Sequence, residues 1–102
     1  MAGFIKVART DGLAPGQGKM VEVSGKKIAL FNVEGQFYAI DDTCTHRGGP
    51  LSEGELAGRT VTCPWHGAPF DVTTGAALGP PASKGVSRYN VRVSGEDIEV
   101  EV

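Results

Sequence analysis

Every cysteine and every histidine of this chain falls into a single pattern. The pattern runs Cys44-x-His46, then sixteen residues, then Cys63-x-x-His66, and the chain has two cysteines and two histidines in all. Thiolate and imidazole are the strongest protein ligands for iron, zinc and copper at neutral pH. The sequence therefore predicts a Cys₂His₂ metal centre that is built from two Cys-then-His pairs.

Length and charge limit the class of protein. A chain of 102 residues has the usual length of one domain, and 40% hydrophobic residues are enough for one core. Its formal net charge of −2, from 10 basic and 12 acidic residues, argues against binding to nucleic acid through phosphate neutralisation. No apolar run approaches the length of a membrane span, and the N-terminus does not have the pattern of a secretion signal. We therefore expect a cytoplasmic protein with no membrane partner, and in that compartment the cysteines are expected to bind metal rather than form a disulfide.

Outside the metal pattern the sequence reads as strands and turns. In the clearest strand, residues 98–102, apolar side chains alternate with glutamates. Turn signals such as Ser24-Gly25 and Glu34-Gly35 separate the alternating segments, and residues 31–38 are typical of a two-residue hairpin. Helical periodicity is absent, apart from one possible turn within residues 50–56. Fifteen glycines and six prolines fit an all-β fold with many tight turns.

The middle of the chain differs from its ends. Residues 41–82 contain the metal pattern and few clean strands, whereas residues 1–40 and 83–102 contain most of the alternating segments. We expect a single domain over residues 1–102. Its base is an antiparallel β-sandwich or barrel closed by both chain ends, and residues 41–82 form an inserted lobe that carries the metal on loops.

The residues around both halves of the pattern resemble the Rieske iron–sulfur family. The segments that carry the resemblance are 44–51 (CTHRGGPL) and 63–71 (CPWHGAPFD). The resemblance implies one [2Fe–2S] cluster, with Cys44 and Cys63 on one iron and His46 and His66 on the other. It also implies an all-β Rieske-like fold, which the β-rich ends of the chain suit.

The resemblance further implies a set of residues around the cluster. They are Arg47, Gly48, Gly49, Trp65, Gly67, Ala68, Phe70, Pro80 and Pro81. The glycines would let backbone approach the cluster and take up positive φ. Trp65 would shield the cluster with apolar surface, and the prolines belong to a third loop that covers it. High-potential respiratory members carry a pair of disulfide-bonded cysteines where Gly49 and Trp65 stand, and hydroxyl-bearing residues where Ala68 and Phe70 stand. Their absence places this chain with the low-potential branch, because hydrogen bonds that favour the reduced state are missing.

A function follows from this resemblance. We expect a one-electron carrier, and not an enzyme with its own substrate, which takes electrons from a flavin-dependent reductase and passes them to a terminal ring-hydroxylating oxygenase. We expect it to act as a monomer. One alternative is the redox small subunit of a nitrite reductase, and another, of a different class, is a zinc-stabilised binding module. The residues do not identify the donor, the acceptor or the compound that is finally oxidised.

Overall fold

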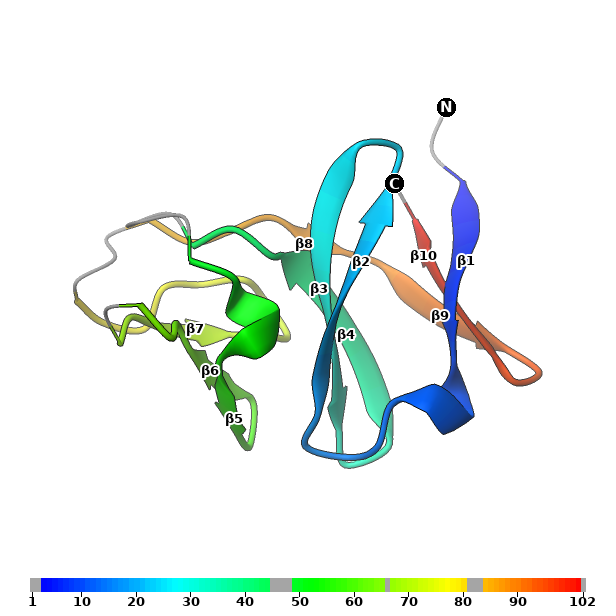
Figure 1. The fold of residues 1–102 in the computed structure, drawn as a ribbon, viewed down its shortest axis with the longest axis horizontal. Helices are drawn as coiled ribbons and strands as arrows, with labels where there is room; N and C mark the ends of the chain where they lie inside the picture. The colour runs from blue at the N-terminus through cyan, green and yellow to red at the C-terminus, as the bar shows by residue number, and fades with distance from the viewer. Residues whose placement is uncertain (1–2, 45–48, 66, 81–83, 102) are drawn as a thin grey trace.

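The computed structural model describes residues 3–44, 49–65, 67–80 and 84–101. Within these ranges the chain forms β-strands and two 3₁₀ turns, and no α-helix (Figure 1). The elements are β1 (Phe4–Arg9), η1 (Thr10–Gly12), β2 (Gly18–Val23), β3 (Lys26–Val33), β4 (Gln36–Asp41), η2 (Leu51–Glu53), β5 (Glu55–Ala57), β6 (Thr60–Thr62), β7 (Pro69–Asp71), β8 (Arg88–Tyr89), β9 (Val91–Ser94) and β10 (Asp97–Glu101). The predicted all-β fold is confirmed.

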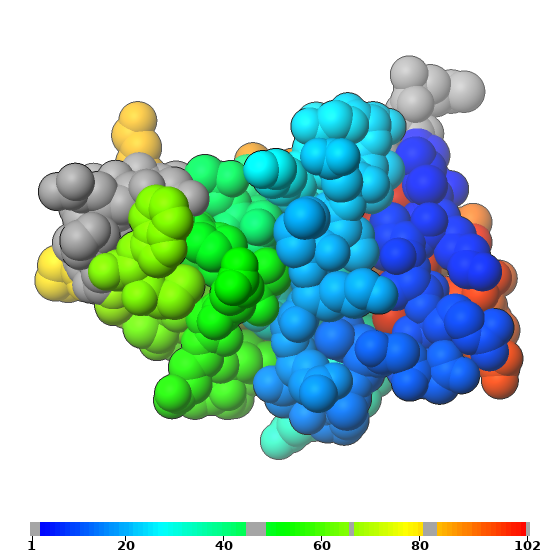
Figure 2. Space-filling model, viewed as in Figure 1, coloured from blue at the N-terminus to red at the C-terminus, as the bar shows by residue number. Residues whose placement is uncertain are grey.

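The strands form three antiparallel sheets, in the orders β1-β10-β9, β2-β3-β4-β8 and β5-β6-β7. The first sheet joins the two ends of the chain, because Phe4 lies opposite Glu101. The sheet β5-β6-β7 lies at the other end of the molecule, and the four-stranded sheet lies between them (Figure 1). The space-filling view shows the same order along the longest extent of 38 Å (Figure 2).

Two tight turns set the register of the four-stranded sheet. Ser24 and Gly25 connect β2 to β3, and Glu34 and Gly35 connect β3 to β4, and all four residues have positive φ. Two consecutive residues with positive φ match the twist of the flanking strands in a two-residue hairpin. The hairpin predicted within residues 31–38 is therefore confirmed.

Strand β3 is buried on both faces. Ile28 and Leu30 pack in one apolar core with residues of β1, β2 and β10, whereas Ala29, Phe31 and Val33 pack in a second core. The second core contains both cysteines. Since side chains alternate across a strand, one strand supplies both cores and joins the base to the region around the cysteines.

The sequence predicted few strands in residues 41–82, but the structure forms the sheet β5-β6-β7 there. Each of its strands has only three residues, so alternation is too short to detect. Its centre is Val61, which is fully buried and lies opposite Leu56 and Phe70. The single turn η2 lies within the segment where one helical turn was predicted.

Candidate metal centre

The first cysteine loop, residues 44–49, follows β4 and is closed at its base. The Cys44 amide donates to the Gly49 carbonyl at 2.9 Å, and Thr43 forms a bridge with Pro50 just outside the loop. The preceding residue, Asp42, is buried and accepts hydrogen bonds from the amides of Leu51 and Ser52, at 2.7 and 2.8 Å. These bonds join the two ends of the loop to each other.

The second cysteine loop, residues 63–68, connects β6 to β7. The Cys63 amide donates to the Ala68 carbonyl at 2.8 Å, and the Gly67 amide donates to the Cys63 carbonyl at 3.0 Å. Gly67 has a φ of 75°, which explains the glycine at this position. In both loops a cysteine amide donates to the carbonyl five residues later. The two loops are thus closed in the same way.

The two loops contact each other. A Cβ placed on Gly49 would lie 2.7 Å from the Cys63 Sγ and 3.0 Å from Cγ of Trp65. Both cysteines are only 2% exposed and share the second core with Phe31 and Phe70. The structure forms no disulfide between Cys44 and Cys63, the cysteines of the described ranges. Both thiols therefore lie buried in the same apolar core.

The described members of the predicted site lie on these loops or next to them. Ala68 and Phe70 are fully buried beneath the second loop, whereas Trp65 and Pro80 are exposed. The segment before Pro80 lies along β7, because the Leu78 amide donates to the Pro69 carbonyl at 2.9 Å. Five members of the predicted site lie outside the described residues: His46, Arg47, Gly48, His66 and Pro81.

Tyr89, for which the sequence predicts no role, packs next to the first cysteine loop. The Tyr89 hydroxyl donates to the Asp41 carboxylate, and the Asp41 amide donates to the Ser87 carbonyl at 2.9 Å. Burial raises the pKa of Tyr89 to about 12, and the hydrogen bond to Asp41 and its negative charge add to this rise. Strand β8 has only two residues and gives no signal in the sequence, so this contact could be found only in the structure.

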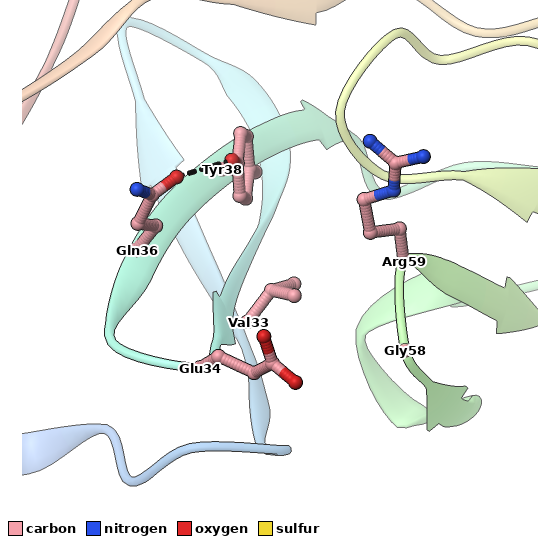
Figure 3. A pocket seen from close by; sticks show the side chains of 6 residues that line it. All are labelled: Val33, Glu34, Gln36, Tyr38, Gly58 and Arg59. Atoms are coloured by element: carbon pink, nitrogen blue, oxygen red, sulfur yellow. Dashed lines mark hydrogen bonds between the residues drawn. The ribbon is translucent and has the colours of Figure 1, made fainter.

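A separate cleft of about 380 Å³ lies between the β3–β4 hairpin and the β5–β6 turn (Figure 3). Its walls are formed by Val33, Glu34, Gln36, Tyr38, Gly58 and Arg59. The Tyr38 hydroxyl donates to the Gln36 side chain at 2.7 Å on one wall, and Arg59 stands on the other. These six residues include no cysteine or histidine, so the cleft is distinct from the metal centre.

Paired cysteine loops on an all-β base define a small metalloprotein whose metal is bound by loops. The arrangement places two buried cysteine sulfurs on these loops, and each cysteine is followed in the sequence by a histidine. The chain belongs to the Rieske [2Fe-2S] domain family, whose sequence pattern matches residues 3–90.

Similar proteins of known role are ferredoxins of oxygenase systems. The ferredoxin component of the naphthalene 1,2-dioxygenase/salicylate 5-hydroxylase systems of Ralstonia sp is 43% identical over 90 residues, which are 88% of this chain and 86% of that protein. The ferredoxin of carbazole 1,9a-dioxygenase from Nocardioides aromaticivorans IC177 has a TM-score of 0.92 at 32% identity, with 95% of each chain covered. A ferredoxin solved in complex with reduced oxygenase of carbazole 1,9a-dioxygenase has a TM-score of 0.90 at 36% identity, covering 95% of this chain and 91% of that one.

Several predictions from the sequence are confirmed by these similarities. The cofactor is a Rieske-type [2Fe–2S] cluster, and the chain is an electron-transfer component rather than a catalytic subunit. The alternative of a zinc-stabilised binding module is wrong. Among the residues that the structure describes, no helix is long and apolar enough to cross a membrane.

Proposed function

We propose that this chain carries single electrons from a flavin-dependent reductase to the terminal oxygenase of a ring-hydroxylating dioxygenase system. The observation that carries the proposal is the pair of buried cysteines on two similarly closed loops in a Rieske-family fold. The ferredoxin roles of the relatives favour an oxygenase over a nitrite reductase as the acceptor. We further propose that the carrier is a cytoplasmic monomer.

The proposed ligands are Cys44, His46, Cys63 and His66. When bound, the cluster supplies a one-electron couple. The two cysteine thiolates offset the charge of two ferric ions and two sulfides, whereas neutral imidazoles add none. The oxidised centre is then neutral, and adding an electron to it is easier than to a centre with four thiolates, which already has negative charge.

The surroundings of the cysteines suit this role. Both sulfurs lie in an apolar core together with the fully buried Ala68 and Phe70, so this side of the centre is closed to water. Neither Ala68 nor Phe70 has a side-chain hydroxyl to donate. Because hydrogen bonds to the sulfurs tune the potential of such a centre, we propose that this chain has a low-potential form of it.

We propose one domain in which residues 1–40 and 83–102 are the base and residues 41–82 are the lobe that meets the partners. The described part of this lobe exposes two large apolar side chains, Trp65 (57%) and Leu78 (51%). Redox encounters use small and weak interfaces, and with a net charge of only −2 the long-range steering of a partner is modest. Local contacts at Trp65, Leu78 and Pro80, together with Arg47, Gly48 and Pro81, would then orient the acceptor.

The test is electron transfer in a reconstituted system of reductase, this chain and terminal oxygenase. We expect Leu78→Ser to lower the second-order rate constant for oxygenase reduction about fivefold, as for a loss of about 1 kcal/mol at an interface. The matched control is Val93→Ser on β9, because Val93 is 49% exposed but belongs to the base. A slower rate in Val93→Ser, with Leu78→Ser unchanged, would place the docking surface on the base instead. Failure of the wild-type chain to reduce any terminal oxygenase would overturn the function itself.

A further inference from the structure

Position 49 requires a glycine because a side chain there has no room. A Cβ at this position would lie 2.7 Å from the Cys63 Sγ, 3.0 Å from Trp65 Cγ and 3.1 Å from Trp65 Cδ2. Each of these distances is shorter than, or at the limit of, what a real Cβ tolerates. Gly49 is buried and its φ is not positive, so the positive φ predicted for it is wrong. Gly67 is the opposite case, since its φ is positive and a Cβ there would meet nothing within 4 Å.

The contact at Gly49 joins the two cysteine loops. The Gly49 carbonyl closes the first loop by accepting a hydrogen bond from the Cys44 amide, whereas Cys63 and Trp65 belong to the second loop. Trp65 is 57% exposed, so the part of its indole that lies against Gly49 fixes the ring while the rest remains open to solvent. The Cys63 sulfur and the base of the indole both meet the same point on the first loop.

We propose that Gly49 and Trp65 form a contact between the two cysteine loops that positions the Cys63 sulfur and thereby sets the reduction potential of the centre. Trp65 and Gly49 act here as positioning residues. The inference rests on the proposed role of Cys63 as a ligand. It follows because the potential of an iron–sulfur centre depends on the surroundings of its sulfurs and on their access to water.

A direction of change follows for Trp65. Removing the indole from beside the Cys63 sulfur admits water there. Water stabilises the reduced centre more than the oxidised one, because reduction turns a neutral centre into an anion. Trp65→Ala should therefore raise the potential, and Trp65→Phe, which keeps an aromatic ring on Gly49, should restore most of the wild-type value.

The experiment measures the isolated protein, so that docking plays no part. Reduction potentials from protein-film voltammetry and electron paramagnetic resonance spectra of the reduced protein are compared for wild type, Gly49→Ala, Trp65→Ala, Trp65→Phe and Gly12→Ala. Gly12 is the matched control, because it is exposed and a Cβ there would meet nothing within 4 Å. We expect Trp65→Ala to change the redox equilibrium constant about tenfold, which is about 59 mV for a one-electron couple.

Gly49→Ala should change the resonance spectrum or lose the cluster, whereas Gly12→Ala should keep both. In the Trp65→Ala background the added methyl group still meets the Cys63 Sγ but no longer the indole, so Gly49→Ala should have a smaller effect there. A wild-type spectrum and potential in Gly49→Ala, or an unchanged potential in Trp65→Ala, would overturn the proposal. Iron retained in Cys63→Ser would instead overturn the ligand assignment, and with it this inference, while leaving the carrier function to its own test.

Discussion

At the scale of single residues, burial and close contact distinguish side chains that are similar in the sequence. Asp41 and Asp42 are neighbours in the sequence. Asp42 joins the ends of the first cysteine loop, whereas Asp41 accepts a hydrogen bond from the Tyr89 hydroxyl. Gly49 and Gly67 both belong to cysteine loops. A side chain has no room at Gly49, whereas Gly67 is needed for its positive φ. The chemistry of each position therefore depends on what faces it.

The first prediction concerns the two cysteines. Cys44→Ser and Cys63→Ser should each abolish the cluster, because serine does not replace a buried thiolate as a soft ligand. Elemental analysis and acid-labile sulfide assays should find two irons and two sulfides per chain in the wild type and almost none in the variants. Thr43→Ser, next to the first loop, is the control and should keep the full content. Zinc without iron in the wild-type protein would contradict the ligand set.

A second prediction concerns Tyr89 at alkaline pH. Its pKa of about 12 in the folded protein lies above the value of about 10 expected in the unfolded chain. Between these two values the folded state binds a proton that the unfolded state has lost. Stability from this group is therefore complete below about pH 10 and declines as the pH rises toward 12.

Urea denaturation at several pH values tests this prediction. Between pH 10 and 12 the wild type should lose stability more steeply than Tyr89→Phe, which has no ionisable hydroxyl. Equal slopes for the two proteins would show that the Tyr89–Asp41 contact does not persist in solution.

At the scale of elements, β3 is the strand on which both cores depend. Phe31 is fully buried in the core that contains the cysteines, and Leu30 is fully buried in the core of the base. A strand that is buried on both faces cannot separate from one core without exposing the other. The region around the cysteines should therefore unfold together with the base.

The third prediction tests this coupling. Phe31→Ala removes a large side chain from the core and should cost about 3–5 kcal/mol, whereas Met20→Ala on the edge strand β2, where Met20 is 44% exposed, should change stability by about 0.5 kcal/mol or less. In urea the visible absorbance of the cluster and the far-ultraviolet circular dichroism should be lost together in the wild type. Loss of the visible band at a clearly lower urea concentration would show that the cysteine region unfolds alone.

The elements also show what could be predicted from the sequence. The hairpin around Glu34-Gly35 was predictable because its turn residues and its alternation agree. The strands β5, β6, β7 and β8 were not, because two or three residues carry no periodicity. The resemblance matched Gly49 and Trp65 to two cysteines that are bonded to each other in the respiratory proteins, and the structure indeed places these residues in contact. The exposure of Leu78 and the position of Tyr89 depend on packing between distant segments, which local sequence does not report.

At the scale of the whole molecule, the surface ion pairs and the cysteine loops lie in different parts of the structure. The ion pairs Lys6–Asp97, Arg9–Glu96 and Arg92–Glu99 lie on the sheet that joins the chain ends or on its β9–β10 turn. Their side chains are mostly exposed, so each contributes little to stability. The cysteine loops lie beyond the four-stranded sheet, where apolar burial dominates (Figure 1).

The fourth prediction is the potential of the whole carrier. Because Ala68 and Phe70 lack hydroxyl donors and no disulfide joins the described parts of the cysteine loops, we expect about −150 to 0 mV near pH 7, the lower part of the range for Rieske centres. Protein-film voltammetry measures it directly. A value above about +150 mV would mean that other donors reach the sulfurs.

The pairing of β1 with β10 has a practical consequence for immobilising the molecule. Phe4 and Glu101 lie opposite each other, so both ends of the described chain leave the base at the same end of the sheet β1-β10-β9, and the sheet β5-β6-β7 lies at the other end of the molecule (Figure 1). A tether attached at either end would bind the base to an electrode or a bead and leave the cysteine region uncovered.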